Sequence, residues 1–201
     1  MAEFRHASFR QGKKYSVDDL IAAIRTGKLA RNLPAHMGTV ADFGCGFDAR
    51  FVRRLLDTGR AENGIAVDLS LDAALMGDHL TLVEADLNTP LPLESESLDV
   101  ACSLAVLEHL DHPDVHLREL YRMLRPGGTL LLTTPSPRAK PVLEFIAYDL
   151  HIIDAAEIRD HKQYFNEAGL RASLHAAGFD PARTSYKKFL FGMNQLVVAV
   201  K

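Results

Sequence analysis

The sequence predicts an α/β protein whose mostly parallel sheet is covered by helices on both faces. Short apolar segments alternate with helical patterns along the chain, the first of them runs into a glycine turn, and others end in an aspartate. Alternating strands and helices are typical of βαβ units, in which crossover helices join parallel strands. The turn and the acids therefore lie at strand ends, where such sheets bind nucleotide-like ligands.

The first strand, turn and helix lie around residues 40–56. The apolar segment that begins at Val40 ends in the turn Gly44-Cys45-Gly46, and an amphipathic helix follows, with apolar positions at Ala49, Phe51, Val52, Leu55 and Leu56. Further strands are expected over residues 63–68, 80–86, 98–105 and 129–134. A helix over residues 114–124 is opened near Pro113 and closed by Pro126, Gly127 and Gly128.

Near the C-terminus, Asn166 can cap a helix over residues 167–177, which Gly178 would end. A closing strand is expected over residues 195–200, and one more strand within 182–191. In the latter, Lys187 and Lys188 indicate a solvated edge.

Two segments are expected to flank or interrupt this main domain, which we place at residues 39–201. Residues 1–38 are expected to form an arm and a helix, because the apolar positions at 17, 20, 21 and 24 have helical spacing. Prolines at 135, 137 and 141 break the chain before the apolar stretch 142–153. We interpret residues 135–165 as a small helical cap near the ligand edge of the sheet.

The composition limits the possible partners. The 201 residues carry a formal net charge of -3 with a pI near 6.3, which disfavours a nucleic-acid partner. No apolar run approaches a bilayer span. The chain has 2 cysteines far apart and no apolar leader after Met1, which together predict a cytoplasmic protein. Its oligomeric state cannot be read from the sequence.

The glycine turn fits more than one cofactor. Gly44-Cys45-Gly46-Phe47-Asp48-Ala49 matches the dinucleotide fingerprint, so an NAD(P)-dependent Rossmann oxidoreductase is one alternative. However, Asp42 and Asp48 flank the turn, and two carboxylates would repel a pyrophosphate. They suit a ligand with positive groups, such as the ammonium and sulfonium of S-adenosylmethionine.

Five segments carry a resemblance to a known family. Residues 40–46 resemble motif I of the class I S-adenosylmethionine-dependent methyltransferases, Val67-Asp68 resembles their ribose-binding acid, and residues 84–87 resemble their adenine-contacting segment. Residues 107–110 and 124–130 are similar to signatures of the subgroup that methylates quinones, sugars and other small metabolites. The resemblance implies a doubly wound, Rossmann-like, seven-stranded sheet of order 3-2-1-4-5-7-6 with an antiparallel last strand.

The resemblance also implies roles for individual residues. Asp42, Gly44 and Gly46 would hold the methionine end of the cofactor, beside Cys45, and Asp68 would bind the ribose hydroxyls, beside Leu69. Asp86 and Leu87 would contact the adenine, and Ser103 and Leu104 would line the pocket under the sulfonium. The family usually has a third glycine where this chain has Asp48, so either the loop is wider or this carboxylate faces solvent as a helix cap.

The acceptor implied by the resemblance is a small molecule methylated on O, N or C. An acceptor hydroxyl or ammonium must lose a proton, and His109 is the candidate base, with a structural histidine as the alternative. His161 and Tyr164, before the last helix, are candidate acceptor-binding residues, whereas Phe165 is expected to pack on the core. A catalytically silent cofactor-binding subunit is a further alternative.

Two other groups of reactive side chains are assigned no chemistry. His109, His112 and His116 invite a metal site, but Pro113 interrupts a continuous helix, so we interpret them as solvated loop histidines and expect no metal. Cys45 and Cys102 lie in or beside apolar strands, where a small buried residue serves as well.

Overall fold

A computed structural model describes residue 29 and the ranges 32–149 and 158–201. The predicted N-terminal helix and residues 150–153 of the apolar stretch in the expected cap lie outside these residues. The helices are α2 (Arg50–Asp57), α3 (Pro113–Met123), α4 (Ala139–Glu144) and α6 (Glu167–Ala177), with short turns η1 (Ala73–Leu75), η2 (Leu107–His109), η3 (Phe145–Asp149) and η4 (Pro181–Arg183). The strands are β1 (Met37–Phe43), β2 (Ala61–Asp68), β3 (Leu80–Glu84), β4 (Leu98–Leu104), β5 (Leu124–Pro135), β6 (Thr184–Phe189) and β7 (Asn194–Val200).

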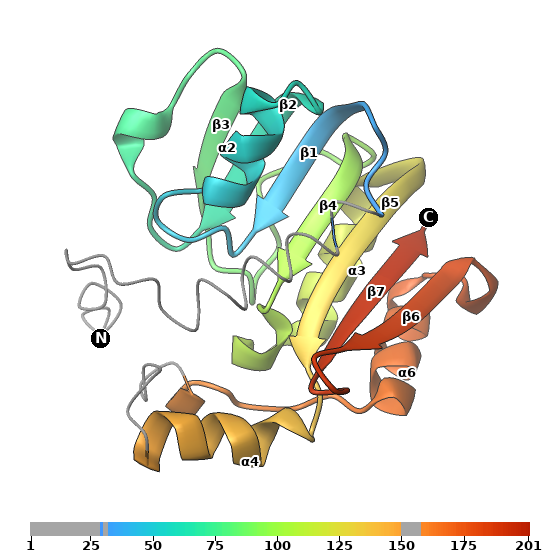
Figure 1. Cartoon of the computed structure of the whole chain (residues 1–201). Helices are drawn as coiled ribbons and strands as arrows, with labels where there is room; N and C mark the ends of the chain where they lie inside the picture. The colour runs from blue at the N-terminus through green and yellow to red at the C-terminus, as the bar shows by residue number, and fades with distance from the viewer. Residues whose placement is uncertain (1–28, 30–31, 150–157) are drawn as a thin grey trace.

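The seven strands form one sheet of order β3-β2-β1-β4-β5-β7-β6 (Figure 1). Strands β1 to β5 pair in parallel, and β7 runs antiparallel to both of its neighbours. The expected strand order and antiparallel last strand are therefore confirmed. The strand order reverses between β1 and β4, and in open parallel sheets ligands bind at such a switch point, outside the carboxyl ends of the strands.

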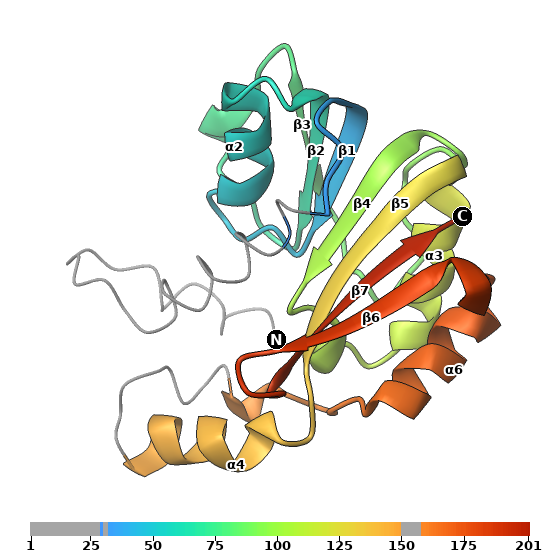
Figure 2. The ribbon, with the colours of Figure 1, turned by 45° about the vertical axis from the view of Figure 1, so that its right-hand side comes forward.

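Helices cover both faces of the sheet, as predicted. Figure 2 shows α2 on one side and α3 with α6 on the other. Val52 and Leu55 of α2 are buried, as are Leu117 and Leu120 of α3. The largest cluster of buried side chains lies between the sheet and the α3 and α6 layer.

The end of α3 differs slightly from the prediction. The helix stops at Met123, and β5 begins at Leu124, so the segment Pro126-Gly127-Gly128 belongs to the strand instead of following the helix as a separate turn. A Cβ at Gly128 would lie 2.9 Å from the Arg125 carbonyl oxygen and 3.0 Å from that of Leu98. A glycine is needed there because two backbones approach closely.

The predicted ends of α6 are confirmed. The Asn166 side chain accepts a hydrogen bond of 2.8 Å from the Gly169 N–H, and Gly178 follows the helix with φ of 112°. A Cβ at Gly178 would lie 2.9 Å from the Tyr121 ring. The left-handed backbone and the close ring both favour glycine.

Beyond β5 the chain enters the expected cap. Helix α4 and the π turn η3 lie past the carboxyl ends of the parallel strands (Figures 1 and 2). On this segment Val142, Phe145 and Tyr148 remain 39%, 54% and 38% exposed. The cap thus presents apolar side chains at the end of the sheet where ligands bind. Within the described ranges, every helix is too short or too polar to traverse a bilayer.

Candidate functional site

The turn after β1 requires its glycines. Gly44 and Gly46 have φ of 70° and 75°, a region that residues with a Cβ rarely adopt. A Cβ at Gly44 would also lie 2.5 Å from the Val106 side chain. The turn is held at the carboxyl edge of the sheet by the end of β2, because the Gly44 N–H donates to the Val67 carbonyl and the Gly46 N–H to the Asp68 carboxylate, each at 2.8 Å.

Asp42 is buried directly beneath this turn. The residue is only 2% exposed, and burial together with the nearby Asp68 carboxylate raises the pKa of Asp42 to about 8. A buried carboxylate of this kind stays protonated at neutral pH unless a cation reaches it. Asp42 thus provides a site that favours a positively charged ligand.

Asp68 at the end of β2 is connected to the glycine turn. One carboxylate oxygen accepts the Gly46 N–H at 2.8 Å, and the other accepts the Leu69 N–H at 2.7 Å. These hydrogen bonds bring together two residues that the sequence assigned to the ribose and methionine ends of one cofactor. Leu69 itself is 48% exposed next to them.

Asp48 occupies the position of the family's third glycine, and it does not cap the helix. The N-cap of α2 is Ala49, with φ of 46° and no side-chain cap bond, and Asp48 instead pairs with Arg50 at 3.2 Å. Of the two alternatives for Asp48, the helix cap is therefore wrong, although the side chain does reach solvent. Its charge is paired with Arg50 near the surface.

The predicted adenine-binding residues lie at the end of β3. The Asp86 carboxylate is exposed and accepts hydrogen bonds from the Asn88 N–H and side-chain amide, each at 2.9 Å. Leu87 is 7% exposed and belongs to the main core cluster. The turn after β3 is thus fixed by its own side chains.

Ser103 has a different neighbour from the one expected. Its side chain is fully buried on the α3 face of β4, where Oγ lies 3.1 Å from Nε2 of His116. It therefore packs into the core, and Leu104 is the more accessible of the two. The chain turns sharply just after them, because Ala105 has φ of 56°.

His116 is not a solvated loop histidine, and that interpretation was wrong. It lies on α3 and is 0% exposed, and burial lowers the pKa of its imidazole to about 3. Its spacing to Leu120 and Met123 is that of one helix face, a signal which could have identified it. His112 is exposed in the loop, as expected.

His109 lies in η2, beyond the end of β4, where it meets residues from the far side of the cap. Its Nδ1 is 2.9 Å from a carboxylate oxygen of Asp160, and its ring packs edge-on against His161 at 4.8 Å between centroids. Nδ1 of His161 in turn lies 2.8 Å from the Tyr164 hydroxyl. Three predicted site residues are therefore in one cluster, although 52 positions separate His109 from His161.

The sequence assigned no role to Asp160 and Thr134, which complete this cluster. The Thr134 hydroxyl donates to the buried Glu108 carboxylate at 3.1 Å, and the Lys162 N–H donates to the Glu108 carbonyl at 2.8 Å. Through these bonds Glu108 holds η2 against β5 and the end of the cap. Asp160 lies in an irregular connection without periodicity, so nothing in the sequence indicated its position.

The electrostatics of the cluster keep two of its groups neutral. Burial and the neighbouring His109 lower the pKa of His161 to about 4. Burial and the carboxylates of Glu144 and Glu108 raise the pKa of Tyr164 to about 12. Both side chains therefore act as neutral hydrogen-bonding groups at pH 7.

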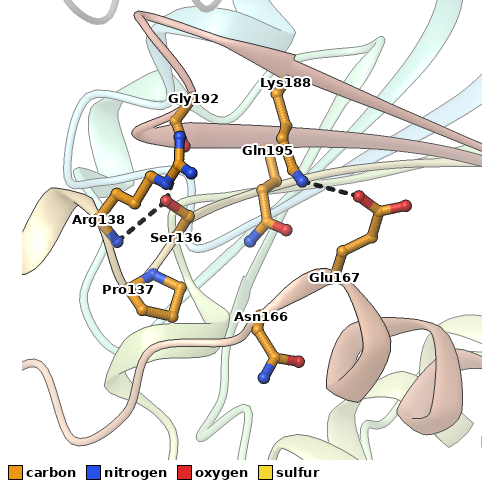
Figure 3. A pocket seen from close by; sticks show the side chains of 8 residues that line it. All are labelled: Ser136, Pro137, Arg138, Asn166, Glu167, Lys188, Gly192 and Gln195. Carbon is orange, nitrogen blue, oxygen red and sulfur yellow. Dashed lines mark hydrogen bonds and ion pairs between the residues drawn. The ribbon is translucent and has the colours of Figure 1, made fainter.

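A separate cavity of about 280 Å³ lies where β5, β7 and α6 meet (Figure 3). An ion pair of 2.9 Å between Lys188 and Glu167 lies in its wall. None of the predicted site residues lines it; its lining comprises Ser136, Pro137, Arg138, Asn166, Glu167, Lys188, Gly192 and Gln195.

Known proteins share both the sequence pattern and the fold. Residues 41–132 match the family model described as a methyltransferase domain. These findings support a class I S-adenosylmethionine-dependent methyltransferase. The matched residues include the glycine turn, Asp68, Asp86 and His109.

Two curated relatives illustrate how far the likeness extends. A ubiquinone biosynthesis O-methyltransferase of Pseudomonas savastanoi pv. phaseolicola is 27% identical over 150 residues, which cover 69% of this chain and 63% of that protein. A probable S-adenosylmethionine-dependent methyltransferase of Mycolicibacterium smegmatis is 34% identical over 96 residues, covering 45% and 32%. This chain thus spans less than two thirds of the length of both relatives.

Solved structures agree on the fold. An S-adenosylmethionine-dependent methyltransferase from Mesorhizobium loti has a TM-score of 0.69 at 20% identity, covering 87% of this chain and 96% of that one. A putative methyltransferase of Haloferax volcanii, in complex with the Trm112 methyltransferase activator, has a TM-score of 0.68 at 21% identity, covering 92% and 95%.

Proposed function

We propose that this protein transfers the methyl group of S-adenosylmethionine to a hydroxyl of a small, partly apolar molecule. One observation carries the proposal. Asp42 lies near the end of β1, and Asp68, which is hydrogen-bonded to the glycine turn, ends the neighbouring strand β2. His109, which pairs with Asp160, follows β4 on the other side of β1. A cofactor end and a proton-accepting end thus belong to the same edge.

The cofactor would occupy the first of these ends. Asp42 would face its ammonium, Gly44, Cys45 and Gly46 would present backbone groups, and Asp68 would exchange its bond to Gly46 for the ribose hydroxyls. Asp86 and Leu87 would contact the adenine from the end of β3, beside Leu69. Ser103 would contribute its backbone, and Leu104 its side chain, because the Ser103 hydroxyl is turned toward His116.

The reaction is a displacement at carbon. The acceptor oxygen attacks the methyl carbon, the carbon–sulfur bond breaks with its electron pair going to sulfur, and the acceptor proton passes to Nε2 of His109. Asp160 would hold the ring through Nδ1, so that Nε2 faces the acceptor. The protein's main contribution is alignment of the two reactants and exclusion of water.

The cap and the neighbouring polar cluster support the choice of acceptor. Val142, Phe145 and Tyr148 give the cap an exposed apolar surface, which suits a ring or chain. The neutral His161 and Tyr164 offer hydrogen bonds without adding positive charge beside a sulfonium. The relatives named ubiquinone biosynthesis O-methyltransferases also support an oxygen acceptor.

Methyl transfer is tested by incubating the protein with methyl-labelled S-adenosylmethionine and pools of phenols, quinols, sugar nucleotides and amines. We expect label in the phenol or quinol pool. His109→Gln should lower kcat by about 10²- to 10⁴-fold, the usual contribution of a general base, with unchanged affinity for S-adenosylhomocysteine. Cofactor binding without transfer to any pool would instead favour the catalytically silent subunit.

Two results would contradict the choice of S-adenosylmethionine as the cofactor. Absence of S-adenosylhomocysteine binding by calorimetry at millimolar ligand would exclude the cofactor. Enhanced NADH fluorescence on titration would favour the oxidoreductase alternative.

A further inference from the structure

The edge of the sheet that carries the acceptor cluster also brings together a set of metal-ligating side chains. Glu108, His109 and His161 each offer one ligand atom, and these three atoms all lie within 4.8 Å of one another. Glu108 is 1% exposed, so this carboxylate is not one of the loosely placed acids common on protein surfaces. The three side chains come from two parts of the chain, since His161 lies 52 positions after His109.

Each of the two imidazoles has its Nδ1 held by a neighbouring oxygen atom. Nδ1 of His109 is engaged by the Asp160 carboxylate at 2.9 Å, and Nδ1 of His161 by the Tyr164 hydroxyl at 2.8 Å. Metal-bound histidines typically use their second nitrogen in this way, which orients Nε2 toward the ion. The Glu108 carboxylate is oriented in the same manner by the Thr134 hydroxyl.

We propose that Glu108, His109 and His161 bind a divalent transition-metal ion such as Zn²⁺ at the acceptor end of the site. Two imidazoles and one carboxylate favour such an ion over Mg²⁺, which prefers oxygen ligands. Ligand atoms about 2.1 Å from one tetrahedral ion lie about 3.4 Å apart. Movements of the three side chains by about 1 Å would therefore bring their ligand atoms to these separations around an ion.

Three protein ligands leave a fourth position open, as in catalytic zinc sites. The role of the ion there rests on the proposed function. An acceptor hydroxyl in the open position would lose its proton more easily, because the ion stabilises the resulting oxyanion. With the ion bound, His109 is a ligand, and a water molecule from solvent takes the proton in its place.

The test uses the full chain, freed of metal with a chelator and titrated with Co²⁺. We expect one equivalent to bind with the visible absorption of a nitrogen- and oxygen-ligated Co²⁺ ion, and Zn²⁺ to displace it. His161→Ala and Glu108→Gln should each weaken Co²⁺ binding at least about tenfold. His112→Ala, which removes an exposed histidine of the same loop, should bind as the wild type does.

Retained binding of S-adenosylhomocysteine will show that each variant is folded. If Glu108→Gln unfolds, the test rests on Co²⁺ binding by His161→Ala, because His161 is only partly buried. Wild-type protein that shows no Co²⁺ absorption at millimolar metal would overturn the proposal, as would Co²⁺ binding that all variants share. Because Co²⁺ binding requires no acceptor, the metal site and methyl transfer can fail independently.

Discussion

One carboxylate oxygen of Asp68 lies 2.8 Å from the backbone nitrogen of Gly46, so the end of β2 is hydrogen-bonded to the turn after β1. The other oxygen accepts the Leu69 N–H. A single side chain thus orders the glycine turn, and in the proposed function it also accepts hydrogen bonds from the ribose diol. Both tasks follow from its place at the carboxyl end of the strand next to β1.

Replacement of this side chain should therefore weaken cofactor binding. We expect Asp68→Ala to reduce the affinity for S-adenosylhomocysteine by at least about 1 kcal/mol, because charge-assisted hydrogen bonds are lost. Calorimetry measures the difference, and Asp57→Ala removes an equal charge from the exposed end of α2 as the control. An affinity equal to that of the wild type would refute the ribose assignment.

Cofactor affinity should also depend on pH through Asp42. Its pKa of about 8 means that the empty site holds a proton at pH 6 to 7, which must leave before the carboxylate can face an ammonium. Affinity for S-adenosylhomocysteine should then rise from pH 6 toward pH 8 and level off above it. Asp42→Asn, which cannot ionise, should bind more weakly and lose this rise; an identical pH dependence in both proteins would contradict the role of Asp42.

His116 should make the protein sensitive to acid. The folded-state pKa of about 3 lies below the ordinary value of 6.5, so below pH 6.5 the unfolded chain binds a proton that the native state does not. The contribution of the neutral imidazole to the free energy of unfolding is therefore complete above about pH 7 and declines as the pH falls toward 3. Between pH 7 and pH 5, it accounts for a loss of about 2 kcal/mol.

Urea unfolding at these two pH values measures that loss. His116→Gln, which cannot take up a proton, should show a pH-dependent decrease smaller by about 2 kcal/mol, whereas His112→Gln in the exposed loop should leave it unchanged. If His116→Gln loses as much stability as the wild type between pH 7 and pH 5, the buried imidazole is not the cause.

The N-cap residue of α6, Asn166, should affect the stability of the protein and not the binding of the cofactor. Asn166→Ala removes the bond to the Gly169 N–H and should lower the free energy of unfolding by about 0.5–2 kcal/mol, as N-cap losses generally do. Asn166→Asp, which keeps the acceptor oxygen, is the matched control and should retain most of that stability. An unaltered urea midpoint for Asn166→Ala would show that the cap is not needed.

The sequence by itself predicted the strands and helices of the main sheet, and it indicated residues for the proposed cofactor end of the site. Glycines at positions 44 and 46, and acids at strand ends, are local signals, because turn geometry and the carboxyl edge of a parallel sheet depend on residues close in the chain. The caps of α6 were predictable for the same reason. The strand order followed from the family resemblance, which rests on motifs in sequence order.

Only the tertiary structure decided which residues meet across long separations. His109 and Asp160 are 51 positions apart, and no local pattern indicates that the cap brings them together. Ser103 lies in a strand buried on both faces, whose continuous apolar run does not reveal which side each residue faces. Burial and the pKa values of Asp42 and His116 likewise depend on the packing of layers contributed by the whole chain.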